Sequence, residues 1–135
     1  MEQYIVLAFI STFFFGLNAI ILKSAKNLDP VALGLISTAT AAIFIFIYWF
    51  FFFSKKQFSP AGIKFGVLSG AAYAIGLILF IMAVKAGKVS IVAGINALST
   101  AVAVILAIIV FSEKLTAIKI GGIILGIIAA VLLAI

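Results

Sequence analysis

The chain has 135 residues, of which 67% are hydrophobic and 9% are charged, and its mean hydropathy is +1.51. Soluble domains are only about half apolar, so this composition excludes a water-soluble globular fold. Cysteine and histidine are absent, which excludes disulfides, thiolate metal sites and the side chain best suited to proton transfer near neutral pH.

Five apolar segments are long enough to cross a membrane, which takes about 20 residues. They are residues 4–22, 31–53, 62–84, 89–111 and 117–135. We therefore expect an all-α integral membrane protein with five transmembrane helices, forming one domain over residues 1–135. We expect no cleaved signal peptide, because Glu2 precedes the first segment and no small-residue cleavage pattern follows it.

The breaks between the segments carry signals for the ends of helices. Asp29-Pro30 and Ser59-Pro60 each place a capping oxygen before a proline at the first helical position. Gly87 is expected to close the third helix in a left-handed conformation. The polar run Ser112-Glu113-Lys114 separates the fourth helix from the fifth.

Nine lysines against three acidic residues give a net charge of +6, which in a soluble protein would suggest nucleic acid. Here the lysines stand between apolar segments, where they hold helix ends at the lipid headgroups. We therefore expect the lipid bilayer, and not nucleic acid, as the partner.

Short connections make neighbouring spans antiparallel, so the lysines divide almost evenly between the two faces of the membrane. The N-terminal face has Lys55, Lys56, Lys64, Lys114 and Lys119, and the other has Lys23, Lys26, Lys85 and Lys88.

This balance permits insertion in either orientation, that is, dual topology, and a mixed population would allow an antiparallel dimer. The alternative is a single orientation set by Lys55-Lys56. The aromatic run Phe44–Phe53 that precedes this lysine pair is typical of an interfacial anchor, and an aromatic cage for a quaternary ammonium group is the alternative.

Small residues recur at a spacing of four on the third and fifth helices, where they allow helices to approach closely in lipid. The two stripes are Gly62, Gly66, Gly70 and Ala74, and Gly122, Gly126, Ala130 and Ala134. The stripe on the fifth helix either joins two chains or packs within one, and the sequence leaves both open.

Polar residues inside the spans are the only groups there that can orient a substrate. A hydroxyl such as that of Ser11, Thr12, Ser37 or Thr38 is most simply satisfied by backbone carbonyls or across helix contacts. Asn18, Tyr73 and Asn96 are stronger candidates, because hydrocarbon would leave the several polar groups of an amide unsatisfied. The predicted substrate-binding residues are Asn18, Tyr73, Asn96, Ser99 and Thr100.

The sequence has no nucleophile paired with a base, no close carboxylate pair and no phosphate-binding loop. We therefore predict that the protein is not an enzyme and that it has no catalytic residues, no metal-binding residues and no cofactor.

Several stretches together resemble an EamA-type domain of the drug/metabolite transporter superfamily. They are GVLSGAAYAIG at residues 66–76, AVKAGKVS at 83–90, FSEKLT at 111–116 and GGIILG at 121–126. The resemblance covers the whole chain, and its most telling part is the pairing of the AVKAGKVS break with the SEKLT break one span later. The family often has a proline within the fourth helix, where this chain has Ser99-Thr100, which puts a proline-assisted bend in doubt. Glu113 is interpreted as a structural cap.

The resemblance implies half of a ten-helix inverted-repeat architecture. Two copies, or one copy with a related partner chain, would surround a central cavity in a prokaryotic inner or plasma membrane. The function it implies is transport of a small metabolite or amphipathic compound by a secondary carrier, most simply an exporter. The alternatives are a non-transporting membrane subunit and a subunit of a lipid-carrier flippase.

Overall fold

The computed structural model describes residues 3–52, 59–112, 114 and 116–134, without the side chains of residues 61, 119 and 134. Some predictions lie outside this part of the chain: those on Glu2, Phe53, Lys55, Lys56, Glu113 and Ile135, and on the side chains of Lys119 and Ala134. Within the described residues every regular element is a helix.

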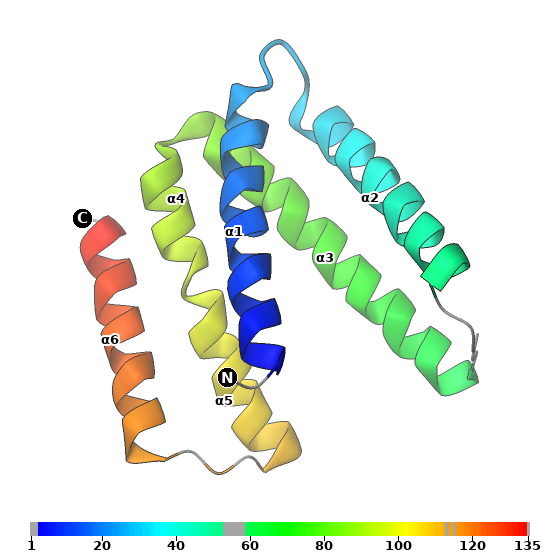
Figure 1. Ribbon diagram of the computed structural model, residues 1–135. Helices are drawn as coiled ribbons and strands as arrows, with labels where there is room; N and C mark the ends of the chain where they lie inside the picture. The colour runs from blue at the N-terminus through cyan, green and yellow to red at the C-terminus, as the bar shows by residue number, and fades with distance from the viewer. Residues whose placement is uncertain (1–2, 53–58, 113, 115, 135) are drawn as a thin grey trace. The chain divides into compact units, whose positions relative to one another are not determined.

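The helices follow the predicted spans closely (Figure 1). They are α1 Gln3–Ser24, α2 Pro30–Phe52, α3 Pro60–Ala86, α4 Val89–Asn96, α5 Ser99–Phe111 and α6 Ala117–Ala134. Four stretches of the described residues are long and apolar enough to cross a membrane: α1, α2, residues 62–86 of α3, and residues 89–111. In α6 the apolar stretch Ile120–Leu133 is shorter. The fifth span and the ten-helix architecture therefore stay predictions.

The starts of α2 and α3 confirm the two proline-based predictions. Pro30 and Pro60 are the first residues of their helices. The Asp29 carboxylate accepts hydrogen bonds from the backbone N–H groups of Val31, at 2.8 Å, and Ala32, at 3.0 Å. The Ser59 hydroxyl accepts one from the N–H of Gly62 at 3.0 Å. Each cap satisfies donors that a helix N-terminus otherwise leaves unpaired.

The predicted left-handed glycine at the end of α3 is wrong. No glycine in the described residues has a positive φ, and the positive values belong to Asn27 (57°) and Ser112 (53°). The end of α3 is held instead by a side chain from the end of α1. The Lys23 ammonium donates to the carbonyls of Val84, at 2.9 Å, and Lys85, at 3.2 Å. A cation at a helix C-terminus satisfies the carbonyls that a left-handed glycine would otherwise help to cap.

Lys85 completes a reciprocal contact with the connection between α1 and α2. Its ammonium donates to the carbonyl of Ala25, and to that of Leu28 at 3.1 Å. Two lysines predicted to lie at the headgroup layer are thus hydrogen-bonded to the backbone of their own chain.

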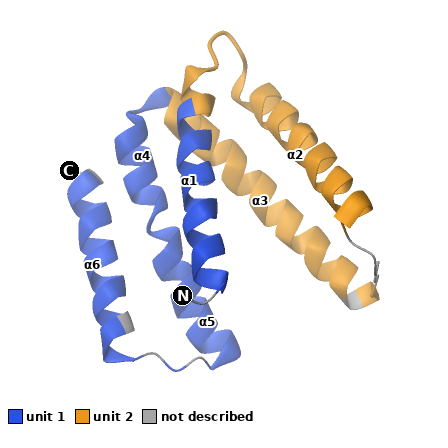
Figure 2. Cartoon of the chain, in the orientation of Figure 1, with its two compact units in different colours: residues 1–20, 86–135 blue, residues 21–85 orange. Residues whose placement is uncertain are grey.

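The chain divides into two compact units, residues 1–20 with 86–135, and residues 21–85 (Figure 2). The core of the second unit lies where the end of α1 and the start of α2 meet the C-terminal half of α3. It consists of Leu22, Leu77 and Ile81, with Leu33 and Phe80 packed against them. Gly34 is buried there, and a Cβ added to it would lie 3.5 Å from the Ile81 side chain.

In the first unit α4 packs against α6. Gly94 is buried, and a Cβ placed on it would lie 2.8 Å from the Cβ of Leu133. Ala130 is also buried, with 3% of its surface exposed. Ala130 of the small-residue stripe on α6 is therefore used for packing within the chain, as close helix contacts in lipid require.

The aromatic end of α2 is exposed over residues 44–52, apart from the half-buried Trp49. Phe46 stacks on Phe50 at a centroid distance of 6.2 Å, and Tyr48 stacks on Phe52 at 5.0 Å. Phe51 has 74% of its surface exposed. The residues of each stacked pair are four positions apart, and the two pairs lie on nearly opposite sides of the helix, which favours the interfacial anchor over a cage closed around a cation.

Candidate functional site

The polar side chains within the spans fall into two groups, and the first is satisfied by its own helix. The hydroxyls of Ser11 and Thr12 both donate to the carbonyl of Ala8, at 2.8 and 2.9 Å. Those of Ser37 and Thr38 donate to the carbonyls of Leu33, at 2.8 Å, and Gly34, at 2.7 Å. For these four residues the simpler interpretation is confirmed, since a hydroxyl bonded three or four residues back needs no other partner.

The second group contains all five predicted substrate-binding residues. In the part of the chain that the structure describes, the side chains of Asn18, Tyr73, Asn96, Ser99 and Thr100 form no hydrogen bond. Asn18 is half-buried on α1, and Tyr73 is exposed on α3, in the second unit. The other three are exposed and lie together on the fourth predicted span.

That span is interrupted between α4 and α5 by a tighter turn, in which Ala97 (φ −61°, ψ −22°) and Leu98 (φ −62°, ψ −19°) keep right-handed helical backbone angles while the hydrogen bonding changes. We call this interruption the break. Leu98 donates its N–H to the carbonyl of Ile95 at 3.0 Å, and Thr100 donates to that of Ala97 at 3.1 Å. Both bonds reach back three residues, whereas an α-helix reaches back four. Regular bonding resumes where Val102 donates to Leu98 at 3.2 Å.

The change of bonding pattern frees backbone groups. In an unbroken helix the carbonyl of Gly94 would accept from Leu98, which donates to Ile95 instead. The N–H of Ala101 would donate to Ala97, whose carbonyl accepts from Thr100 instead. The sequence put only a proline-assisted bend in doubt, since Ser99-Thr100 stand where the family often has a proline. The helix nevertheless breaks, at Ala97-Leu98, between asparagine and serine, two residue types with weak helix propensity.

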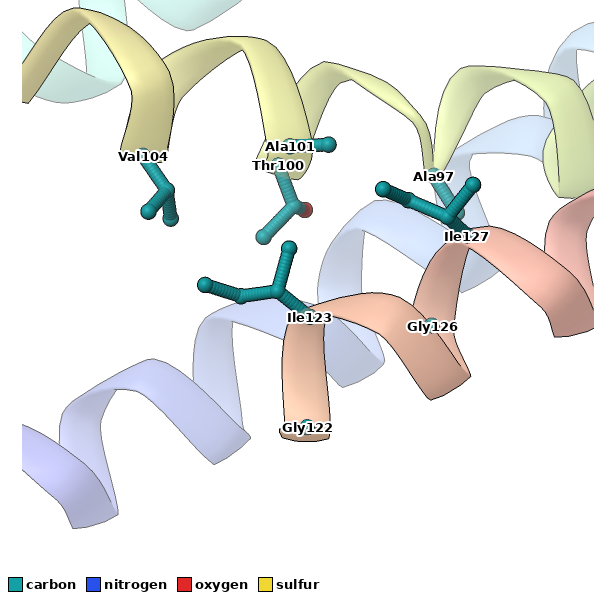
Figure 3. Close-up of a pocket in the computed structure, with 8 residues that line it drawn as sticks. All are labelled: Ala97, Thr100, Ala101, Val104, Gly122, Ile123, Gly126 and Ile127. Carbon is teal, nitrogen blue, oxygen red and sulfur yellow. The ribbon is translucent and has the colours of Figure 1, made fainter. Parts of the chain in front are cut away.

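Beside the break, α5 and the first part of α6 enclose a groove of about 490 Å³. One wall consists of Ala97, Thr100, Ala101 and Val104, and the other of Gly122, Ile123, Gly126 and Ile127. Figure 3 shows Thr100 opposite Ile123, with bare backbone at Gly122 and Gly126. A Cβ added at either glycine would have no heavy atom within 4 Å apart from its own helix backbone. The N-terminal half of the small-residue stripe is therefore open.

Thr100 is thus the one predicted residue that lines the groove. Asn96 and Ser99 lie on either side of the break, outside the groove lining. The sequence did not single out the α6 wall as part of a site, because α6 has no polar residue after Lys119 and its glycines were interpreted as a packing stripe. The only signal for this wall was the spacing of Gly122 and Gly126.

A sequence profile of the EamA-like transporter family matches residues 3–135. No curated protein and no solved structure gives a significant match. Because the profile covers nearly the whole chain, the chain belongs to the EamA-like transporter family. The predicted resemblance is confirmed. The family and the four candidate spans make the chain a multi-pass membrane protein of a transporter family, not of an enzyme family.

Proposed function

We propose that this member of the EamA-like transporter family carries a small metabolite or an amphipathic compound across the membrane by alternating access. It acts as a secondary carrier in a prokaryotic plasma membrane, in the direction of export. The observation that carries this proposal is the break between α4 and α5 inside the candidate span 89–111.

A break inside a span is costly unless something polar surrounds it. Hydrocarbon offers no partner for a freed N–H or carbonyl, and each unsatisfied group costs several kcal/mol. Irregular backbone at membrane depth is therefore found where it is buried in protein or lines a water-filled cavity. The eight residues of α4 place the break about 12 Å along the helix axis from Val89, within the hydrocarbon layer if the span lies across it.

The side chains near this break support the same interpretation. Asn96, Ser99 and Thr100 form no hydrogen bond within the described residues. Carriers place substrate sites at interrupted helices, because the freed backbone and nearby polar side chains can bind a substrate that has lost its water. We assign Asn96, Ser99 and Thr100 to the substrate path at the break, and Asn18 and Tyr73 to the path from α1 and α3.

We further propose that the working unit is a homodimer or a pair with a related chain. Residues 3–135 give one family match, whereas alternating access in this superfamily uses two related halves. The near balance of lysines between the two faces supports dual topology and antiparallel pairing.

Transport into proteoliposomes tests the function. Uptake of a broad panel of radiolabelled metabolites is measured for the wild type, Asn96→Leu, Thr100→Val and the control Thr12→Val. Threonine and valine have nearly the same shape, but the Thr12 hydroxyl already bonds to Ala8. Thr100→Val should lower uptake about two- to tenfold, the equivalent of one neutral hydrogen bond. Asn96→Leu should lower it further, and Thr12→Val should leave it unchanged. Uptake of nothing on the panel by the wild type, or equal uptake by all four proteins, would reject the proposal.

Reporter fusions at the C-terminus test the orientation. A reporter active only outside and one active only inside should both give signal in the same cells. Signal from one side alone would reject dual topology and favour a parallel pair.

A further inference from the structure

We infer that the groove between α5 and α6 binds the apolar part of a neutral amphipathic substrate, whose polar end bonds to the break between α4 and α5. This inference rests on the proposed function, because it names the kind of substrate and adds a second helix to its site. All of its parts lie within the first unit of the chain.

The lining of the groove sets the charge and polarity of its occupant. Of the eight lining residues, Thr100 alone has a polar side chain, and none is ionisable. An ion would lose its hydration here without gaining a counter-charge, which is strongly unfavourable in a medium of low dielectric constant. A neutral, mostly hydrocarbon body fits this lining, and the volume of about 490 Å³ lies within the range of about 300–1,000 Å³ usual for small-molecule pockets.

An apolar groove alone would not select a substrate from lipid. Acyl chains are as apolar as the groove, so contact with its walls supplies no preference over the bilayer. Any preference must come from the polar groups in the middle of the α5 wall, where the Thr100 hydroxyl forms no hydrogen bond within the described residues and Ala101 has lost its helical acceptor. A molecule with a hydroxyl or carbonyl beside a hydrocarbon body can bond there, whereas a plain hydrocarbon cannot.

Gly122 and Gly126 line the α6 wall without a side chain, and a Cβ added at either would meet no heavy atom within 4 Å apart from its own helix backbone. Gly121 provides a matched control, because it is the adjacent residue, does not line the groove and also has no heavy atom near an added Cβ. Leucine at position 122 should therefore fill the groove, and leucine at position 121 should leave it open.

Photolabelling of the full chain in liposomes tests this with two probes of matched length, a diazirine-bearing octanol and the corresponding diazirine-bearing octane. Labelled residues are identified by mass spectrometry. The alcohol should label residues 97–104 and 122–127 about two- to tenfold more than the hydrocarbon does, which is the equivalent of one neutral hydrogen bond. Gly122→Leu should abolish labelling of the groove, and Gly121→Leu should retain it. Thr100→Val should reduce the preference for the alcohol.

Three results would overturn the inference. Equal labelling by both probes would show a groove filled by acyl chains. Label spread evenly over all spans would show partitioning into the bilayer. The third result is that the groove takes up no label and that Gly122→Leu, but not Gly121→Leu, loses the cross-linked dimer. This result would assign the groove to the contact between two copies of the chain.

The labelling experiment and the transport experiment can fail independently of each other. If Asn96→Leu lowers transport while the two probes label equally, the carrier function stands and the substrate class is wrong. If the alcohol labels the groove with the expected preference while the wild type transports nothing on the panel, the binding site stands and the carrier function is wrong.

Discussion

Replacing Gly94 by alanine should destabilise the packing of α4 against α6. The added Cβ would lie 2.8 Å from the Cβ of Leu133 and 3.3 Å from its Cδ1. Carbon atoms pack best at about 3.5–4.0 Å, so the two helices must separate by roughly 0.7–1.2 Å. A Cβ atom cannot move aside as the end of a flexible side chain can. We expect Gly94→Ala to lower the free energy of unfolding by about 1–3 kcal/mol, the usual cost of overpacking.

The assay is unfolding of the purified protein in mixed micelles by increasing the fraction of a denaturing detergent, followed by circular dichroism. The control is Gly66→Ala, because nothing lies within 4 Å of a Cβ at Gly66 and alanine favours a helix by up to about 1 kcal/mol. Adding Leu133→Ala to Gly94→Ala should restore only part of the loss, since alanine keeps the Cβ at 2.8 Å. The reasoning is refuted if Gly94→Ala is as stable as Gly66→Ala.

The same unfolding assay checks three further substitutions. Lys85→Met removes the hydrogen bonds from its ammonium to the Ala25 and Leu28 carbonyls and should lower the free energy of unfolding by about 1–2 kcal/mol. The control Lys26→Met should change it little, because Lys26 is exposed. An equal loss of stability in both variants would contradict the role assigned to Lys85. Asp29→Ala removes the cap of α2 and should cost about 0.5–2 kcal/mol, with Asp29→Asn close to the wild type. Ile81→Ala should cost about 1–3 kcal/mol, less than in a water-soluble core because lipid supplies no transfer term. Leu79→Ala, at a side chain 61% exposed, should cost much less, and equal effects would argue against the core placed at Ile81.

Features with a local cause were predictable from the sequence. The caps at Asp29 and Ser59 depend on residues within three positions of the oxygen, and both are present. The satisfied hydroxyls of Thr12 and Thr38 likewise depend only on carbonyls of the preceding turn. The lengths of the spans follow from the thickness of the bilayer, which is the same for any sequence.

Features with a tertiary cause were not predictable. The end of α3 is capped by Lys23, which lies 61 residues before Val84 in the chain, so Gly87 was the only visible local candidate. The stripe on α6 is uniform in sequence, yet Ala130 is buried and Gly126 is open. Whether a small residue meets a neighbour depends on where two helices converge, and spacing along one helix does not contain that information.

Thr12 and Thr100 differ in the hydrogen bonding of their side chains. Both threonines are exposed and both lie in candidate spans. The Thr12 hydroxyl bonds to the carbonyl four residues back, whereas Thr100 lies just after the point where bonding shifts to three residues and its hydroxyl stays unbonded. The hydroxyls of Thr40 and Ser69 also form no hydrogen bond within the described residues, so it is the freed backbone beside Thr100 that distinguishes the break. The backbone groups freed at the break therefore need a partner from protein, water or a ligand, and the proposed carrier function predicts that water and substrate exchange there.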